Sequence, residues 1–322
     1  MTPPEGVVPT RRLAASEVVV LLGLAACSGS ESEPPVRLDG PTPSFPGFIP
    51  PENRAPCPGA VDPATLTVAD GAQAETASDV PEPREITLTS SDRAEVPALV
   101  APGTNGAGVV LVHGGFGRRP KTEDFLELAA AGYTVIGPEY RTNDIGGLEV
   151  DDVAAAARFL AEERGIEPAR IALVGTSHGA SIAALVAARF PEVAGALVWA
   201  AGPADWSCIW SLNEGRGLAR TLERSMGTTP EDDHGFLAYA ERSPLYWAHE
   251  VTVPVHLVHS RHDGAVPPGQ SQLMADALRA AGVDVEWRLA SGRGHRFLDR
   301  EDARGLADWA YILDFLRRTI GA

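Results

Sequence analysis

The sequence predicts an α/β protein built on a mostly parallel, doubly wound β-sheet. From about residue 84 onward, short apolar runs alternate with helical patterns, and the run 108–112 is apolar at every position. A strand that is buried on both faces has this composition, because helices cover both sides of a parallel sheet. At 322 residues the chain is long enough for one large domain of this kind.

Residues 1–26 have the features of a signal peptide. Arg11 and Arg12 precede an apolar run, Val18–Ala26, which is far shorter than the roughly 20 residues that span a bilayer. The end of this run, Leu24-Ala25-Ala26-Cys27, resembles the lipobox of bacterial lipoproteins. That resemblance implies that Cys27 is acylated and holds an exported protein at the membrane of the bacterial cell surface. An ordinary signal peptide is the alternative.

Residues 27–83 are predicted to form an acidic, largely disordered tether between Cys27 and the folded domain. They contain 12 of the 27 prolines and show no sustained periodicity. Such a composition buries too little apolar surface to offset the entropy of ordering it. Cys57 lies in this tether and Cys208 in the domain that follows, so in an oxidising exterior the two could pair; two free thiols are the alternative.

The domain is expected to cover residues 84–322, and its first elements are strands. Residues 85–89 alternate between polar and apolar side chains, as does the run 96–100, and 108–112 is the buried strand. Thr122 can cap a helix that extends to Ala131 before Gly132, and a strand at 133–137 follows.

The middle of the domain repeats the helix–strand alternation. Residues 151–164 predict a helix with Val153, Ala157 and Leu160 on one face. A buried strand at 171–174, a helix at 181–189 and a strand at 195–200 come next.

A helical insertion at about 203–251 interrupts the alternation before the last strands. It is rich in aromatic residues, which either roof a substrate pocket or form a small core of their own: Trp206, Trp210, Phe236, Tyr239, Tyr246 and Trp247. The alternation then resumes with strands at 253–260 and 283–289 and helices at 270–281 and 302–320.

A serine lies at the sharpest turn of this pattern. Gly175-Thr176-Ser177-His178-Gly179 joins a buried strand to a helix, an arrangement that exposes the Ser177 hydroxyl at the top of the sheet. Gly175 and Gly179 leave room for a strained turn. The pattern therefore predicts a nucleophile, with an ordinary strand–helix turn as the alternative.

Two further residues follow this serine in an informative order. Asp263 comes just after one strand and His295 lies in the loop after the next. A serine needs a base that takes its proton and an acid that orients the base, and the order Ser…Asp…His is that of α/β-hydrolases. The oxyanion donors are expected to be the backbone N–H of His178 and that of Gly115 or Phe116.

Composition argues against several other functions. The formal net charge is −16, and Lys121 is the only lysine, so we expect no nucleic-acid partner. The glycine-rich stretch 103–108 precedes a strand and is therefore no phosphate loop. His256 and His259, with His262 and Asp263, suggest a zinc site, but on a strand the first two point to opposite faces. We expect neither a metal nor a cofactor.

Residues 84–320 resemble the α/β-hydrolase catalytic domain of the prolyl oligopeptidase family and its single-domain esterase relatives. The resemblance rests on short motifs along the domain: His113-Gly114-Gly115-Phe116, Tyr140-Arg141, Gly175–Gly179, Arg242-Ser243-Pro244-Leu245, His262-Asp263, Val266-Pro267, Gln270-Ser271 and Gly294-His295-Arg296-Phe297. It implies Ser177 as nucleophile, Asp263 as acid and His295 as base.

The family's peptidases carry a β-propeller before this domain, and the sequence has no internal repeat that would form one. We therefore expect a secreted, lipid-anchored serine hydrolase that acts on a small-molecule carboxylic ester through an acyl-enzyme. A peptidase of the prolyl oligopeptidase type, acting on short peptides, is the alternative, and a catalytically inactive binding protein of the same fold is a second one. The sequence does not predict an oligomeric state.

Overall fold

The computed structural model describes residues 57–58, 82–116, 119–120, 125–142, 144–290, 294–296, 298 and 303–321. The chain divides into two units, 1–37 and 38–322, and every described residue belongs to the second. The predicted signal peptide, Cys27, most of the tether and the predicted helix cap at Thr122 lie outside the described residues.

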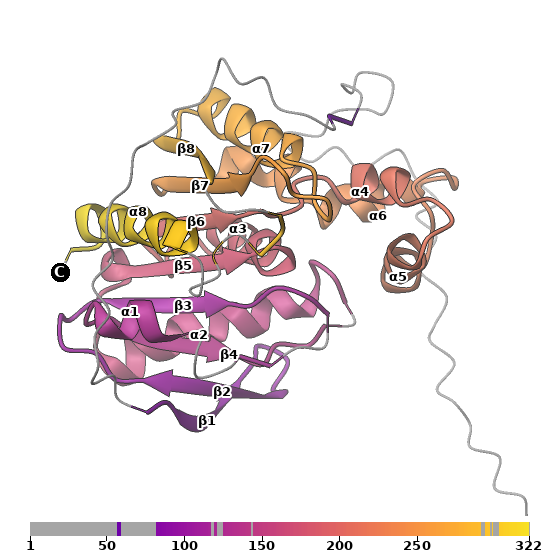
Figure 1. The fold of residues 1–322 in the computed structure, drawn as a ribbon. Coiled ribbons are helices and arrows are strands. Elements are labelled where there is room, and N and C mark those ends of the chain that lie inside the picture. Colours follow the sequence, from indigo (N-terminus) through magenta and orange to yellow (C-terminus); the bar gives the residue numbers. More distant parts are fainter. Residues whose placement is uncertain are drawn as a thin grey trace, which may run out of the picture. The chain divides into compact units, whose positions relative to one another are not determined.

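The described part of the chain forms an eight-stranded sheet in the order β1-β2-β4-β3-β5-β6-β7-β8 (Figure 1). The edge strand β1 is antiparallel to β2, β2 is antiparallel to β4, and all other neighbours are parallel. The strands are β1 Arg84–Thr89, β2 Glu95–Ala101, β3 Gly108–Val112, β4 Thr134–Pro138, β5 Ile171–Thr176, β6 Ala196–Ala200, β7 Val255–Ser260 and β8 Val285–Ala290.

Helices cover both faces of this sheet. One face packs against α2 (Leu148–Arg164), α3 (His178–Arg189) and α7 (Gly269–Ala280), and the other against α1 (Leu126–Ala130) and α8 (Ala303–Thr319). Strand β3 contributes to both cores, because Val110 and Val112 face the first and Val109 and Leu111 the second. The predicted fold class, a mostly parallel doubly wound sheet, is confirmed.

Helix α2 begins at Leu148, three residues before the start that the sequence pattern predicts. The reason lies in the preceding loop, where a carboxylate oxygen of Asp144 accepts the Leu148 N–H at 2.8 Å and so satisfies one donor of the first turn. The earlier start places Glu149 inside the helix, where its side chain is buried.

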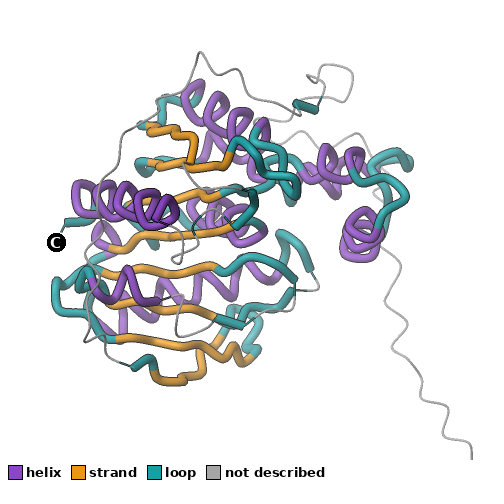
Figure 2. The backbone as a smooth tube through the Cα atoms, in the orientation of Figure 1, coloured by secondary structure: helices purple, strands orange, loops and turns teal. Residues whose placement is uncertain are grey.

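The insertion between β6 and β7 consists of short helices joined by loops, and it lies beyond the carboxyl ends of the parallel strands (Figure 2). They are α4 (Trp206–Leu212), α5 (Gly217–Met226), α6 (Gly235–Glu241) and a 3-10 helix (Pro244–Glu250).

The aromatic residues of this insertion form small cores of its own. Trp206, Trp210 and Tyr239 belong to one buried cluster, and Phe236 and Tyr246 to another. Of the two interpretations that the sequence leaves open, the structure favours the internal core over the pocket roof. Val266, on the loop after β7, joins the first cluster and so packs the insertion against that loop.

A disulfide joins Cys57 to Cys208 on α4, with the two Cα atoms 5.5 Å apart. The sulfur of Cys208 also accepts a hydrogen bond from the side-chain amide of Gln270, at 3.1 Å. The structure thus attaches part of the predicted tether to the insertion.

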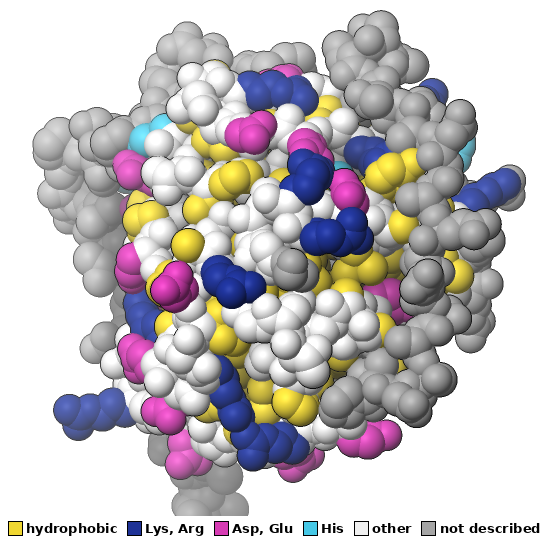
Figure 3. Space-filling view, turned by 90° about the vertical axis from the view of Figure 1, so that its left-hand side faces the viewer, with side chains coloured by type: hydrophobic (Ala, Val, Ile, Leu, Met, Phe, Trp, Pro, Cys, Tyr) yellow, Lys and Arg dark blue, Asp and Glu magenta, His cyan; other side chains and the backbone are white. Residues whose placement is uncertain are grey.

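Charged side chains of both signs lie side by side on the face opposite the insertion. In Figure 3, which views the molecule from the side at which the parallel strands begin, arginines and carboxylates alternate over apolar patches.

Candidate active site

Ser177 occupies a strained turn between β5 and α3. Its backbone has φ 54° and ψ −126°, a conformation that a non-glycine residue adopts only when its surroundings enforce it. Its N–H donates to the Ala200 carbonyl at the end of β6, at 2.7 Å. These restraints hold the hydroxyl at the carboxyl edge of the sheet.

The structure brings Ser177, His295 and Asp263 into one hydrogen-bonded chain. The Nε2 atom of His295 lies 2.8 Å from the Ser177 Oγ, and its Nδ1 lies 2.7 Å from Asp263 Oδ2. An ionised carboxylate only accepts hydrogen bonds, so Nδ1 carries the hydrogen and Nε2 is left to accept the serine proton. This is the arrangement of a general base oriented by an acid.

Asp263 is held rigidly in the loop after β7. One carboxylate oxygen accepts the N–H groups of Ala265 and Val266, at 2.8 and 3.0 Å. Burial of this carboxylate raises its pKa, but hydrogen bonds from His259, His295 and the Val266 backbone outweigh burial and hold the pKa well below its usual range. The acid of the triad therefore stays ionised at any pH at which hydrolysis would be measured.

A second, buried histidine also donates a hydrogen bond to this carboxylate. The Nε2 atom of His259 lies 3.1 Å from Asp263 Oδ2 and 3.0 Å from the Val266 carbonyl, both acceptors, so it carries the hydrogen. Its Nδ1 then accepts from Ser271 Oγ at 2.7 Å, which in turn accepts the Trp199 indole N–H at 3.0 Å. The sequence analysis considered His259 only as a zinc ligand. The four-residue spacing between His259 and Asp263 was the one feature of the sequence that could have indicated this contact.

The loop after β3 runs directly past the nucleophile. A methyl group on Gly114 would lie 2.9 Å from the Ser177 Cβ, so only glycine permits this approach. Gly115 has φ 79°, and the Phe116 side chain is 37% exposed beside the site. The expected oxyanion donors of Gly115 or Phe116 therefore belong to a loop that passes the serine.

The other expected oxyanion donor belongs to the first residue of α3. The backbone N–H of His178 lies in the first helical turn, for which the helix itself provides no acceptor. The His178 side chain packs against Phe116, with ring centroids 4.6 Å apart. The loop after β3 and the start of α3 therefore meet at Ser177.

A buried carboxylate that the sequence pattern did not single out also reaches this region. Glu149, in the first turn of α2, places Oε1 2.8 Å from the Nε2 atom of His178. The position of Glu149, two residues before the predicted start of the helix, was the one feature of the sequence that could have indicated this contact.

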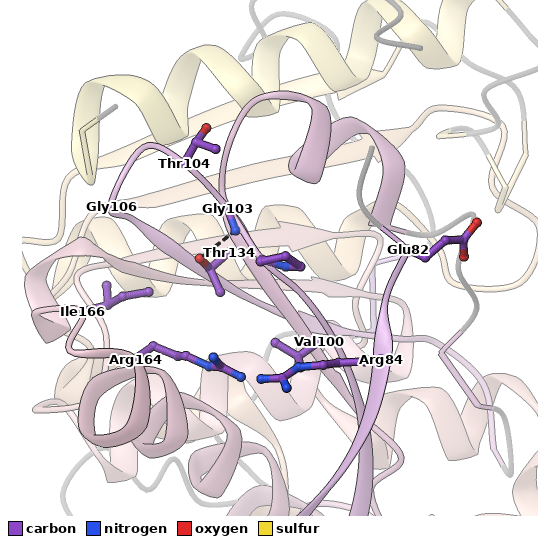
Figure 4. Close-up of a pocket in the computed structure, with 10 residues that line it drawn as sticks. Glu82, Arg84, Val100, Gly103, Thr104, Gly106, Thr134, Arg164 and Ile166 are labelled. Atoms are coloured by element: carbon purple, nitrogen blue, oxygen red, sulfur yellow. Dashed lines mark hydrogen bonds between the residues drawn. The ribbon is translucent and has the colours of Figure 1, made fainter. Parts of the chain in front are cut away.

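A surface cavity of about 550 Å³ lies at the other end of the sheet, around the starts of β3 and β4 (Figure 4). Arg84 and Arg164 extend toward each other across it, and the Gly103 N–H donates to the Thr134 hydroxyl at its back. None of the triad residues lines it, so it is not the substrate pocket of Ser177.

Comparison with known proteins agrees with this geometry. The model of the prolyl oligopeptidase family matches residues 131–322, which hold all three triad residues. The chain belongs to the prolyl oligopeptidase family. It is similar to the uncharacterized peptidase YtmA of Bacillus subtilis, with 27% identity over 186 residues that cover 56% of this chain and 71% of that protein.

Solved structures of the same family show the same fold. A puromycin-hydrolyzing peptidase of Mycobacterium tuberculosis superimposes with a TM-score of 0.65 at 27% identity, over 74% of this chain and 39% of that one. An acylaminoacyl peptidase bound to a chloromethyl ketone gives a TM-score of 0.66 at 20% identity, over 76% of this chain and 42% of that one. The chain thus spans less than half the length of these family members.

Proposed function

We propose that this member of the prolyl oligopeptidase family is a serine peptidase that cleaves short peptides or aminoacyl amides through an acyl-enzyme. The observation that carries the proposal is the Ser177–His295–Asp263 chain, with contacts of 2.8 and 2.7 Å, in a family whose members named above are peptidases. The serine hydrolase chemistry follows from the geometry, and the peptide substrate is the proposed part.

The residues of the site have distinct tasks in this reaction. His295 takes the Ser177 proton as Oγ attacks the carbonyl carbon, and Asp263 stabilises the imidazolium that forms. The backbone donors of the loop after β3 and of His178 stabilise the oxyanion. His295 then gives the proton to the leaving amine. Water attacks the acyl-enzyme as His295 takes a proton from it, and this proton passes to the Ser177 Oγ as the carboxylic acid leaves.

The expectation of an ester substrate rested on a sequence with no internal repeat that would form a β-propeller, and the aromatic insertion was left open as a pocket roof. Most of those aromatic side chains are buried in small cores, and the relatives named above are peptidases, so a peptide substrate is favoured. An esterase therefore becomes one outcome of the test, and a catalytically inactive binding protein is another.

The decisive measurement compares an amide and an ester that share one acyl group. We expect the ratio of kcat/KM for a peptidyl p-nitroanilide to that for the matching p-nitrophenyl ester to exceed about 10⁻², because a peptidase protonates the leaving amine and holds the peptide in register. A ratio below about 10⁻⁴, equivalent to roughly 5.5 kcal/mol of transition-state stabilisation, would establish an esterase. Failure of Ser177 to react with a fluorophosphonate would establish the inactive protein; Ser177→Ala is the control.

We also propose that the protein is exported and anchored through Cys27. The Cys57–Cys208 disulfide supports an oxidising compartment, where such bonds persist. None of the described helices is both long and apolar enough to cross a bilayer.

Replacement of Cys27 by serine tests the anchor. We expect Cys27→Ser to move the protein from the detergent phase to the aqueous phase of a Triton X-114 partition, because the acyl chains provide the membrane affinity. Cys57→Ser is the control, since it removes a cysteine without touching the anchor. Wild-type protein found wholly in the aqueous phase would contradict the proposal.

A further inference from the structure

A buried polar pair that the triad does not use lies beside the nucleophile. The side chains of Glu149 and His178 are 0% and 3% exposed, and Glu149 Oε1 lies 2.8 Å from His178 Nε2. The same oxygen accepts the Gly146 N–H at 2.6 Å. A carboxylate oxygen only accepts hydrogen bonds, so the hydrogen of the pair is on Nε2, and His178 is the donor.

This hydrogen bond fixes the rotation of the His178 ring. Among the described residues, the other ring nitrogen, Nδ1, has no hydrogen-bond partner. The ring also packs against three aromatic side chains: Phe116 at 4.6 Å, Trp206 at 5.8 Å and Tyr140 at 6.0 Å between ring centroids. Aromatic packing fixes the position of the His178 ring. The hydrogen bond to Glu149 fixes its rotation, and so determines which edge of the ring faces each neighbour.

The ring connects the two expected halves of the oxyanion hole. His178 carries one expected donor on its own backbone, and its ring contacts Phe116, in the loop that carries the other. Any rotation of the ring would therefore change the separation of that loop from the start of α3. Oxyanion stabilisation depends on donors that are already in place when charge develops.

We propose that Glu149 is a positioning residue that acts through His178 to hold the oxyanion loop against the start of α3. The inference depends on the proposed serine hydrolase mechanism. Its signature is a loss of kcat with little change of KM, because the oxyanion exists in the transition state and not in the bound substrate.

A purely structural role makes a different prediction. Replacing a buried polar pair by apolar side chains of similar volume is often neutral for stability. The double variant E149L/H178F keeps a ring against Phe116 and removes both members of the pair, so neither is left buried without the other; the Gly146 N–H alone loses its acceptor. If the pair matters only for folding, this variant should be as active as wild type.

We expect E149L/H178F to fold and to show a kcat 10- to 100-fold lower for p-nitrophenyl butyrate, with KM within about threefold of wild type. Glu149→Gln, which keeps the Oε1 acceptor, should retain kcat within about fivefold, whereas the shorter Glu149→Asp should lose it. His256→Phe is the matched control: it removes a buried histidine that pairs with Glu286 on the far side of the sheet, and should leave kcat unchanged.

Several results would overturn the inference. They are wild-type kcat in the double variant, a rise of KM alone, or equal kcat in Glu149→Asp and Glu149→Gln; the last comparison stands even if the double variant fails to fold. Wild-type protein that does not react with a fluorophosphonate would instead reject the proposed function, which separates the two failures.

Discussion

Ser177→Ala and His295→Ala are each expected to lower kcat by at least about 10³-fold, the largest effect that any substitution in this protein should have on the reaction. Without the Oγ no acyl-enzyme forms, and without the imidazole nothing takes the hydroxyl proton 2.8 Å away. Asp263→Asn should be the mildest of the three losses, since it leaves the contacts in place but favours the wrong tautomer of His295.

Steady-state kinetics on the single and combined variants checks this expectation. The losses should not add, because the three residues act as one unit and each single change already removes it. Unchanged circular dichroism and melting temperature serve as the control for folding. A kcat for Asp263→Asn within about tenfold of wild type would contradict the assignment of the acid.

Gly179→Ala is expected to destabilise the protein by more than about 4 kcal/mol, which is a large share of the free energy of unfolding of an ordinary domain. A methyl group at this position would lie far inside van der Waals contact of the Val112 and His113 carbonyl oxygens. Both are backbone atoms of β3 and its loop, so they cannot move aside without displacing the strand that packs against the nucleophile turn.

Thermal unfolding of purified protein, or its yield in the soluble fraction, measures the effect. Gly217→Ala is the matched control, because a methyl group there meets nothing within 4 Å and the residue begins helix α5. That variant should melt at or slightly above the wild-type temperature, since alanine favours helix over glycine. A Gly179→Ala variant that melts within about 2 °C of wild type would show that the turn can relax.

Local patterns in the sequence accounted for most of the fold and for the three triad residues. Gly175–Gly179 combines a buried strand, a turn and a helix within a few residues, so its conformation is encoded where it occurs. Asp263 and His295 could be predicted because parallel strands end at one edge of the sheet, which brings the loops after β7 and β8 toward the loop after β5.

The residues around the triad were decided by tertiary structure. Glu149 and His178 are 29 residues apart, and Cys57 and Cys208 are 151 apart; no periodicity relates the members of either pair. The sequence likewise could not choose between a pocket roof and an internal core for the aromatic insertion, because both require the same side chains. What the sequence by itself determined was the order of buried strands and helices and the turns between them, because those depend on neighbouring residues. Which polar side chains are buried beside the nucleophile depends on how distant segments pack, and only the folded chain decides that.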